Sequence, residues 1–219
     1  MTAVQYLLEL LFPRKCVLCG RILGRHETDL CRKCRIEAPE FSGKRKEIPF
    51  VEEWTAVWRY EEDVRHSLLR FKFYNARGNA EAYGRLLAMR LVREELADFD
   101  AMTWVPIGRL RRWERGYDQV ELVAEVVGRE LAVQPVKLLK KVRSNRRQSG
   151  LDSVEARKAN VLGAYQAVSP EGVKGKRILL LDDILTTGAT MSECARVLLT
   201  AGAKEVNGAV VAAASHNKK

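Results

Sequence analysis

The sequence predicts an α/β protein in which helices flank a parallel sheet, preceded by a small cysteine-rich segment. Two observations lead to this prediction. From about residue 54 onward, short apolar runs alternate with longer stretches of helical periodicity, which is the pattern of a parallel sheet. Ahead of them, four cysteines form two Cys-x-x-Cys pairs. We therefore divide the chain into residues 1–40, a linker over 41–53, and a main domain over 54–219.

The individual elements follow from hydrophobic periodicity and from turn residues. In chain order, strands are expected at residues 55–60, 101–106, 176–182 and 206–213, and helices at 1–12, 64–73, 80–96, 119–131 and 192–199. Asp118 is a candidate N-cap, or a capping residue one position off, because Glu121 follows three residues later. Residues 141–160 are polar, basic and without periodicity, so we expect a mobile loop there.

The paired cysteines predict a structural zinc site. Each Cys-x-x-Cys knuckle turns two thiolates toward one ion, and eleven residues separate the two knuckles. Four thiolates leave no open coordination position, so the zinc is not expected to be catalytic. Two disulfides are the alternative, which a reducing compartment disfavours. The expected ligands are Cys16, Cys19, Cys31 and Cys34, whereas Cys194 is expected to be a small buried apolar residue.

Residues 177–191 are the most informative part of the chain. An apolar run at 178–181 predicts a strand covered on both faces, and Asp182 and Asp183 come at its carboxyl end, where α/β sheets place ligands. Residues 186–190 read Thr-Thr-Gly-Ala-Thr and precede a helix, so their amides and hydroxyls suit a phosphate. The two acids suit hydroxyls or a hydrated Mg²⁺. A plain strand–turn–helix with incidental acids is the alternative.

The formal net charge is +10, and the basic residues cluster at 14–35, 109–115 and 137–147. Such clusters attract polyanions, including nucleic acids. A solvated surface that serves one small phosphorylated ligand is the alternative. No apolar stretch reaches the length of about 18 residues that spans a membrane. Residues 4–12 lack the basic leader and cleavage site of a signal peptide, so we expect a cytoplasmic protein.

The strand, the two acids and the Thr-Thr-Gly-x-Thr loop resemble the signature of type I phosphoribosyltransferases, which bind phosphoribosyl pyrophosphate (PRPP). The resemblance implies that Asp182 and Asp183 hold the ribose 2′- and 3′-hydroxyls, with Mg²⁺ carried in by PRPP. It also implies a 5′-phosphate cradle formed by Thr186, Thr187, Gly188, Ala189 and Thr190. Purine-salvage members have an aspartate where Thr186 stands here, so a purine transferase of that kind is not expected.

Further segments resemble the ComF family of bacteria. They are the cysteine pairs, Phe-Lys-Phe-Tyr at 71–74, Val-Pro at 105–106 followed by Arg-Gly-Tyr-Asp-Gln at 115–119, and Gln-x-x-Leu then Arg-x-x-Asn within 148–160. The resemblance extends from about residue 7 to residue 213. It implies a zinc finger joined to a type I phosphoribosyltransferase-like domain. It also implies a role in natural transformation, in which family members handle single-stranded DNA after uptake beside a helicase-like ATPase.

Superfamily members bind pyrophosphate with the loop after a neighbouring strand. That role maps to Pro106, Ile107, Gly108 and Arg109, with Arg115 nearby. Arg115 has an alternative role in a salt bridge to Glu114 or Asp118. Lys72 is expected to point into the same cleft, unless it is a lysine snorkelling at the edge of the core. A lid over the ligand is expected from Arg147, Gln148, Arg157 and Asn160, for which an ordinary solvated loop is the alternative.

Three functions remain open on the sequence. The first is a protein of DNA uptake that binds PRPP and single-stranded DNA and works with a motor ATPase. The second is an active phosphoribosyltransferase with an unidentified acceptor, because no segment indicates a nucleobase pocket or a nucleophile. The third is an adaptor that binds PRPP without turnover and presents the zinc finger to a protein.

Overall fold

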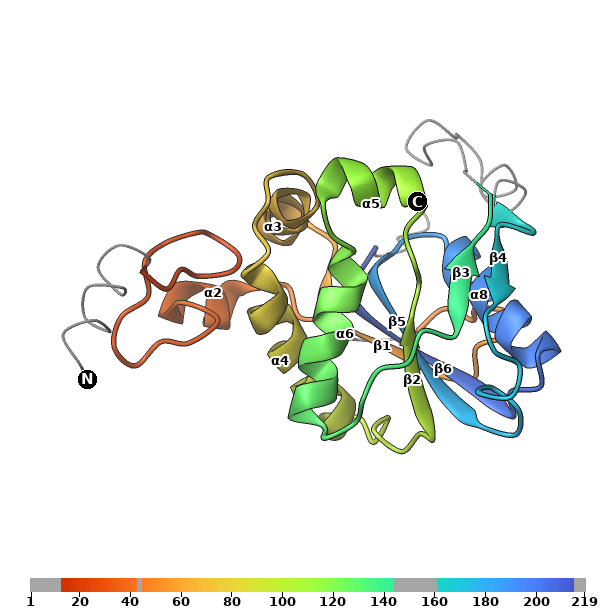
Figure 1. The fold of residues 1–219 in the computed structure, drawn as a ribbon. Helices are drawn as coiled ribbons and strands as arrows, with labels where there is room; N and C mark the ends of the chain where they lie inside the picture. The colour runs from red at the N-terminus through yellow and green to blue at the C-terminus, as the bar shows by residue number, and fades with distance from the viewer. Residues whose placement is uncertain (1–12, 43–44, 144–160, 215–219) are drawn as a thin grey trace, which may run out of the picture.

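The structure is a computed structural model that describes residues 13–42, 45–143 and 161–214. At its centre is a four-stranded sheet in the order β1-β6-β5-β2 (Figure 1). The strands are β1 (Trp54–Arg59), β6 (Glu205–Ala213), β5 (Arg177–Leu185) and β2 (Ala101–Trp104). All neighbouring strands pair in parallel, which confirms the predicted α/β class.

The apolar run in β5 is continuous because helices cover both faces of the sheet. Leu179 and Leu181 point into one core cluster, whereas Ile178 and Leu180 point into the other. All four side chains are fully buried. A strand with one solvated face would instead alternate between apolar and polar residues.

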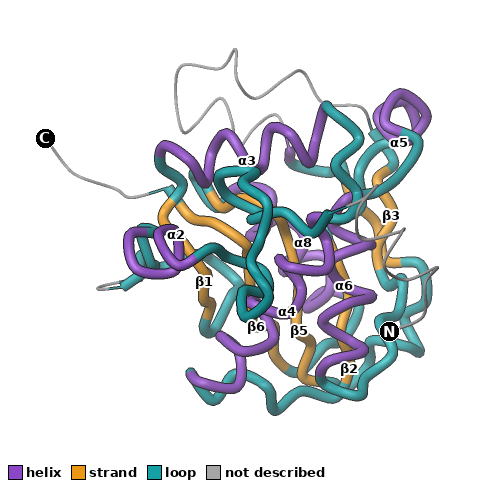
Figure 2. The backbone as a smooth tube through the Cα atoms, turned by 90° about the vertical axis from the view of Figure 1, so that its left-hand side faces the viewer, coloured by secondary structure: helices purple, strands orange, loops and turns teal. Residues whose placement is uncertain are grey.

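Helices α3 (Glu62–Phe73), α4 (Asn79–Arg93) and α6 (Gln119–Glu130) contribute to the first cluster and cover one face. Helix α8 (Ala189–Thr200) covers the other face, together with a hairpin of β3 (Leu139–Lys141) and β4 (Tyr165–Ala167) (Figures 1 and 2). Across the described part of the chain, no helix is long and apolar enough to cross a membrane.

The cysteine-rich segment, with the short helix α2 (Arg32–Glu37), lies against α3 and α4 on the side away from α8 (Figure 1). Val17 and Leu18 are buried in the same core cluster as those helices. Two side chains of α3 bind the backbone here: Ser67 donates to the Val17 carbonyl, and Arg70 Nη2 donates to the Leu18 carbonyl at 2.5 Å. The segment is therefore docked on the main domain by both apolar and polar contacts.

Several predicted elements need correction. The basic loop after β2 is in fact a helix, α5 (Arg109–Arg115), which ends at Gly116 in a left-handed conformation (φ 74°). Strand β5 does not end at 182 but continues to Leu185, because Asp182, Ile184 and Leu185 still pair with β6. The β3–β4 hairpin was not predicted, because its strands are three residues long and twenty-three residues separate them.

Two predictions concern residues outside the described ranges, namely the helix over 1–12 and residues 144–160 of the predicted loop. The other predicted strands and helices lie within a few residues of their predicted positions, whereas the short helix α2 was not predicted. Asp118 is the N-cap of α6, and its carboxylate accepts hydrogen bonds from the amides of Val120 and Glu121, as its place in the sequence predicted.

Close packing of α4 against α6 requires a glycine and gives a test of the fold. A Cβ added to Gly84 would lie 2.3 Å from Val126 Cβ, too close for any rotamer change to relieve. We expect Gly84→Ala to lower the free energy of unfolding by about 1–3 kcal/mol, as overpacked cores do, measured by urea denaturation. The matched control is Gly78→Ala, whose added methyl meets no atom within 4 Å. Equal midpoints for the two variants would contradict the close approach.

Candidate functional site

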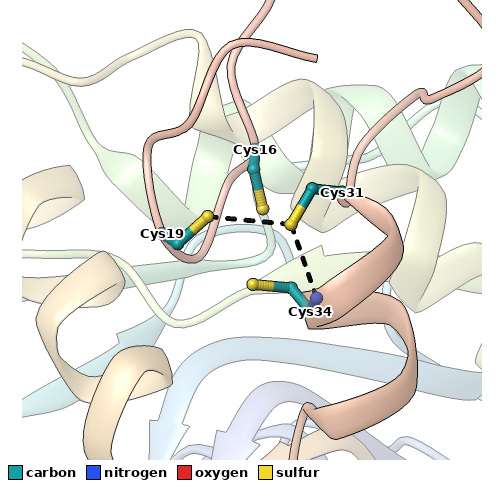
Figure 3. Close-up of side chains that lie close together, drawn as sticks. All are labelled: Cys16, Cys19, Cys31 and Cys34. Atoms are coloured by element: carbon teal, nitrogen blue, oxygen red, sulfur yellow. Dashed lines mark hydrogen bonds between the residues drawn. The ribbon is translucent and has the colours of Figure 1, made fainter. Parts of the chain in front are cut away.

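The four paired cysteines converge at one point, as the zinc prediction required. Their Sγ atoms all lie within 4.8 Å of one another, and Cys16, Cys31 and Cys34 are buried. Figure 3 shows the four sulfurs facing a common centre, with Cys34 on the first turns of α2. The Cys34 amide also donates to Cys31 Sγ at 3.4 Å, a contact that favours the thiolate form of that sulfur.

This geometry fits a tetrahedral zinc ion and differs from that of a disulfide. Zn–S bonds of ~2.3 Å place the sulfurs of a tetrahedron about 3.8 Å apart, and the Cys19–Cys31 Sγ distance is 3.8 Å. A disulfide would need about 2.05 Å, and all five cysteines of the chain are free. Cys194 lies fully buried in α8, far from the cluster in sequence, as expected for a small apolar residue.

The two acids of β5 lie side by side but have different surroundings. Asp183 is buried, receives a salt bridge of 2.9 Å from Lys72 Nζ, and accepts a hydrogen bond from Gln119 Nε2 at 2.9 Å. Lys72 comes from the end of α3 and Gln119 from the start of α6. Arg115 extends this network, because its Nη1 donates to Gln119 Oε1 at 2.8 Å.

These partners give the neighbouring carboxyls opposite pKa shifts. Burial alone would raise the pKa of Asp183, but Lys72 and Gln119 together hold that pKa below its ordinary value. Among the described residues, Asp182 has no such cation in contact. Burial and the adjacent charge of Asp183 raise the pKa of Asp182 to about 8. The site therefore holds one carboxylate that a lysine compensates, and one carboxyl that needs an incoming cation or hydroxyl partner to ionise at neutral pH.

The loop between β2 and α5 is fixed against α6 at the mouth of this site. Asp118 is buried, and its Oδ2 accepts the Ile107 amide at 3.0 Å while its Oδ1 caps α6. One carboxylate thus sets the positions of both the loop over 105–108 and the helix that carries Gln119. Arg115 does not pair with Asp118, since its guanidinium reaches Gln119 and lies 5.1 Å from the centre of the Phe73 ring.

A cleft of about 340 Å³ opens beside the two acids. Of the residues expected from the sequence, those lining it are Lys72, Pro106, Ile107, Arg115, Asp182, Asp183, Thr186 and Thr190. Thr187, Gly188 and Ala189 belong to the same turn but do not line the cleft. Gly108 and Arg109 do not line it either, and Arg109 is exposed at the start of α5. The expected lid residues Arg147, Gln148, Arg157 and Asn160 lie outside the described ranges.

Five lining residues that carry a polar group were not among the expected site residues, and only the tertiary structure brings them there. They are Tyr60, Arg111, Gln119, Lys141 and Tyr165. The basic clusters at 109–115 and 137–147 contained two of them, but a cluster does not say which member faces a cleft. Lys141 Nζ lies 3.2 Å from Tyr165 Oη across the β3–β4 hairpin. Burial and the nearby Arg111 lower the pKa of Lys141, so an anion in the cleft would be favoured there.

The turn over 186–190 leads into α8 and is supported from outside by the linker. Gly188 has φ 82°, a left-handed conformation that favours glycine, and a Cβ there would lie 3.4 Å from Ile48. Lys46 Nζ donates to the Thr186 carbonyl, and Trp54 Nε1 donates to the Lys46 carbonyl at 2.8 Å. Burial lowers the pKa of Lys46 to about 8, so an anion held by this turn would stabilise the charged lysine.

The cleft thus combines two carboxylates with Lys72, Arg111, Arg115 and Lys141, and the turn over 186–190 forms part of its wall. Guanidinium groups bind phosphate oxygens in pairs, and the first amides of α8 favour an anion. Carboxylate oxygens suit sugar hydroxyls and Mg²⁺. A ligand with two phosphate groups separated by a polyhydroxylated ring matches this distribution of charge.

Comparison with protein families agrees with this geometry. Residues 121–219 match the phosphoribosyl transferase domain, and residues 7–45 match the double zinc ribbon domain. The first match contains both acids and the turn that follows them. The second contains all four cysteines.

Similarity to characterised proteins extends over most of the chain. Competence protein F of Haemophilus influenzae is 27% identical over 218 residues, covering 89% of this chain and 95% of that protein. The chain is a homologue of the ComF competence proteins. Competence protein ComFC of Bacillus subtilis is 28% identical over 85% of this chain and 72% of its own. DNA utilization protein YhgH of Escherichia coli K12 is 28% identical over 87% of this chain and 86% of its own.

Two solved structures align with part of this ComF homologue. Glutamine PRPP amidotransferase from B. subtilis superimposes with a TM-score of 0.41 at 22% identity, over 65% of this chain. An allosteric regulatory enzyme of purine biosynthesis gives a TM-score of 0.39 at 23% identity, over 59% of this chain. The aligned regions span only 30% and 25% of those longer chains.

Replacement of one zinc ligand tests the metal centre. In Cys34→Ser we expect the metal content to fall from about one zinc per chain to near zero, measured by atomic emission. We also expect unfolding to be easier by at least about 2 kcal/mol, because Leu18 loses its buried position against α3. Cys194→Ala is the control and should keep its zinc. Equal zinc content in both variants would show that the cysteine cluster is not the metal site.

The opposite pKa shifts of the two acids predict opposite effects of neutralising them. Between the unfolded pKa of 3.8 and the folded value of about 8, folded Asp182 keeps a proton that the unfolded chain releases, so its contribution to stability falls as pH rises. We therefore expect Asp182→Asn to raise Tm by a few degrees at pH 8, with a difference that shrinks toward pH 4.

Asp183→Asn should act in the opposite sense. The folded pKa of Asp183 is lowered, so its stabilising contribution is present above the unfolded pKa and lost in acid. We expect a lower Tm at pH 7–8, because the variant leaves Lys72 without its charge partner, and a difference that shrinks as the pH falls below 3.8 toward the lowered folded pKa. Thermal scans of both variants from pH 3 to 8 check this, and Tm changes of the same sign at pH 8 would contradict the assignment.

Proposed function

We propose that this ComF homologue binds PRPP together with Mg²⁺ and acts in DNA uptake, where it contacts single-stranded DNA in the cytoplasm beside a helicase-like motor ATPase. Asp182 and Asp183 hold the ribose hydroxyls, and the turn over 186–190 holds the 5′-phosphate. The cations of the opposite wall hold the pyrophosphate. Mg²⁺ would enter with the pyrophosphate and supply positive charge beside the carboxylates.

One observation carries the PRPP assignment: the two acids, the two ends of the turn over 186–190 (Thr186 and Thr190) and four cations line the same cleft. Anion groups of the ligand would then meet Arg111, Arg115 and Lys141 on one side and the start of α8 on the other. The match of residues 121–219 to the phosphoribosyl transferase domain supports this assignment independently of the geometry.

The DNA part of the proposal rests on the relatives and on charge. The similar proteins are named for competence and for DNA utilization. The chain carries a net charge of +10, well beyond what a single PRPP needs, and such a surface attracts a polyanion. The motor ATPase is proposed by family resemblance, because a strand entering a cell needs an energy source to move it.

Turnover of PRPP is a second candidate function. The hydrogen-bonded network around Asp183 is the observation that favours it. In that case an acceptor would displace pyrophosphate at the anomeric carbon of ribose. Arg111, Arg115 and Lys141 would stabilise the negative charge of the leaving group, which is the largest electrostatic demand of such a reaction. Binding without turnover would make the protein an adaptor whose conformation or partner reports on PRPP.

Calorimetric titration of the full chain with PRPP and Mg²⁺ tests the proposal. We expect binding at a single site, weakened at least tenfold, or about 1.4 kcal/mol, in Asp182→Asn and in Asp183→Asn. Wild-type Tm should rise by about 5–10 °C at a hundredfold excess over Kd. The matched control is Asp98→Asn, because Asp98 is an exposed carboxylate that pairs with Arg177 at the opposite end of β5. Absence of binding at millimolar PRPP would overturn the proposal.

The same samples separate enzyme from adaptor. Mass spectrometry after incubation with PRPP, Mg²⁺ and candidate acceptors, including nucleobases, amines and oligonucleotides, would detect a ribosylated product and released pyrophosphate. Product formation that Asp183→Asn abolishes would establish transfer. Binding without any product would leave the adaptor role.

A further inference from the structure

A second cavity of about 780 Å³ adjoins the PRPP cleft, and the function proposed above does not use it. Its lining includes residues from the end of α3 and from α5, and these two helices occupy the same end of the molecule in both views (Figures 1 and 2). The two cavities share Tyr60, Lys72, Arg111 and Arg115 in their walls. We call this second cavity the aromatic groove, defined by Phe73, Arg77, Trp113, Arg115 and Tyr117.

Two of its aromatic side chains are unusually open to solvent. Trp113 is 82% exposed and Phe73 is 64% exposed, although both are large and apolar. The other three tryptophans, Trp54, Trp58 and Trp104, are at most 6% exposed. Most large aromatic side chains of a stable domain are buried, so adjacent exposed ones on the wall of a cavity indicate a binding surface.

Arginines lie over the aromatic rings of the groove. The Arg77 guanidinium carbon is 4.7 Å from the centre of the Tyr117 ring, and that of Arg115 is 5.1 Å from the centre of the Phe73 ring. A planar guanidinium held on a ring presents its outer face and edge to a further planar group and its N–H donors to phosphate oxygens. Along the whole groove, four cations face one acid, Glu114.

Resting on the proposed function, we infer that the aromatic groove is where this protein binds the unpaired bases of single-stranded DNA. Bases stack on aromatic rings and on guanidinium planes whatever their sequence, while basic residues follow the phosphates. Trp113 and Phe73 supply the stacking faces, and Arg77 with Arg111 supplies the charge. Duplex DNA does not fit this role, because its bases are already stacked and their faces are covered.

A protein partner is the other occupant that exposed tryptophan and arginine would suit. The charge of the groove and its continuity with a cleft for a phosphorylated sugar favour nucleic acid. A strand in the groove would place a nucleotide next to the PRPP cleft, since the shared wall of Lys72, Arg111 and Arg115 separates the two sites by no more than one layer of side chains.

Tryptophan fluorescence tests this site directly, because Trp113 is the exposed member of the four tryptophans in the chain. We expect a fluorescein-labelled oligothymidylate to bind in an anisotropy assay, and an unlabelled copy to quench the intrinsic emission. Trp113→Ala should weaken binding about tenfold or more. Trp113→Phe keeps a stacking ring, so it should bind within about threefold of the wild type while the quenching disappears.

Two matched controls isolate the groove. Met89→Ala removes an exposed apolar side chain (67% exposed) from α4, outside the groove, and should leave binding unchanged. An abasic strand of equal length carries the same phosphates without bases. It should bind about tenfold more weakly to the wild type, and this preference for the strand with bases should shrink in Trp113→Ala, which keeps only Phe73 as a stacking face. Circular dichroism of each variant confirms that it is folded.

The outcomes separate this inference from the function it rests on. If oligothymidylate binds but Trp113→Ala binds it equally well, or if the abasic strand binds as tightly, the groove is not the base-binding site although DNA binding stands. If no strand binds at low salt, the DNA part of the proposed function fails as well. Calorimetry with PRPP on the same protein reports on the ribose-phosphate site independently of either result.

Discussion

Two adjacent carboxyl groups near the carboxyl end of β5 are the constraint around which the rest of this structure is arranged. Two like charges cannot both be buried without compensation, because desolvation and mutual repulsion each disfavour ionisation. The fold compensates Asp183 with Lys72 from α3 and Gln119 from α6, and it leaves Asp182 with a raised pKa of about 8. The uncompensated acid lowers the stability of the empty protein, and a ligand bearing hydroxyls and a cation would relieve that cost. A binding site of this kind lowers the free energy of unfolding of the ligand-free protein, as functional sites commonly do.

The metal centre contributes to this site through packing. Zinc would hold the cysteine-rich segment in the form that docks on α3, where Ser67 and Arg70 bind its backbone carbonyls. Lys72 lies on the same helix, within two turns of those contacts. The linker that follows reaches the other side of the cleft, where Ile48 lies against Gly188 and Lys46 binds the Thr186 carbonyl. Segments before the main domain therefore touch both the helix that compensates the acids and the turn that would hold a phosphate.

Much of the fold was predictable because strong local signals agreed with the tertiary structure. The apolar run of β5 could only be a strand covered on both faces, and Asp118 caps α6 as its sequence context indicated. Where the prediction was wrong, local signals were weak. Helix α5 has no buried side chain, so its sequence shows no apolar stripe. Strands β3 and β4 are three residues each, and their pairing depends on a contact between distant segments that no local periodicity records.

The sequence by itself determined the chemistry available: four thiolates at metal-binding spacing, two acids after a buried strand, and a threonine–glycine turn before a helix. These patterns are local, since each is set by residues within a few positions of one another. Only the tertiary structure decided which distant side chains complete the site. Gln119, Lys141 and Tyr165 enter the cleft from three separate elements, and Trp113 with Phe73 forms a groove from α5 and α3. Nothing in the spacing of these residues predicts their meeting, because contacts between elements depend on how helices and hairpins pack over the ends of the sheet.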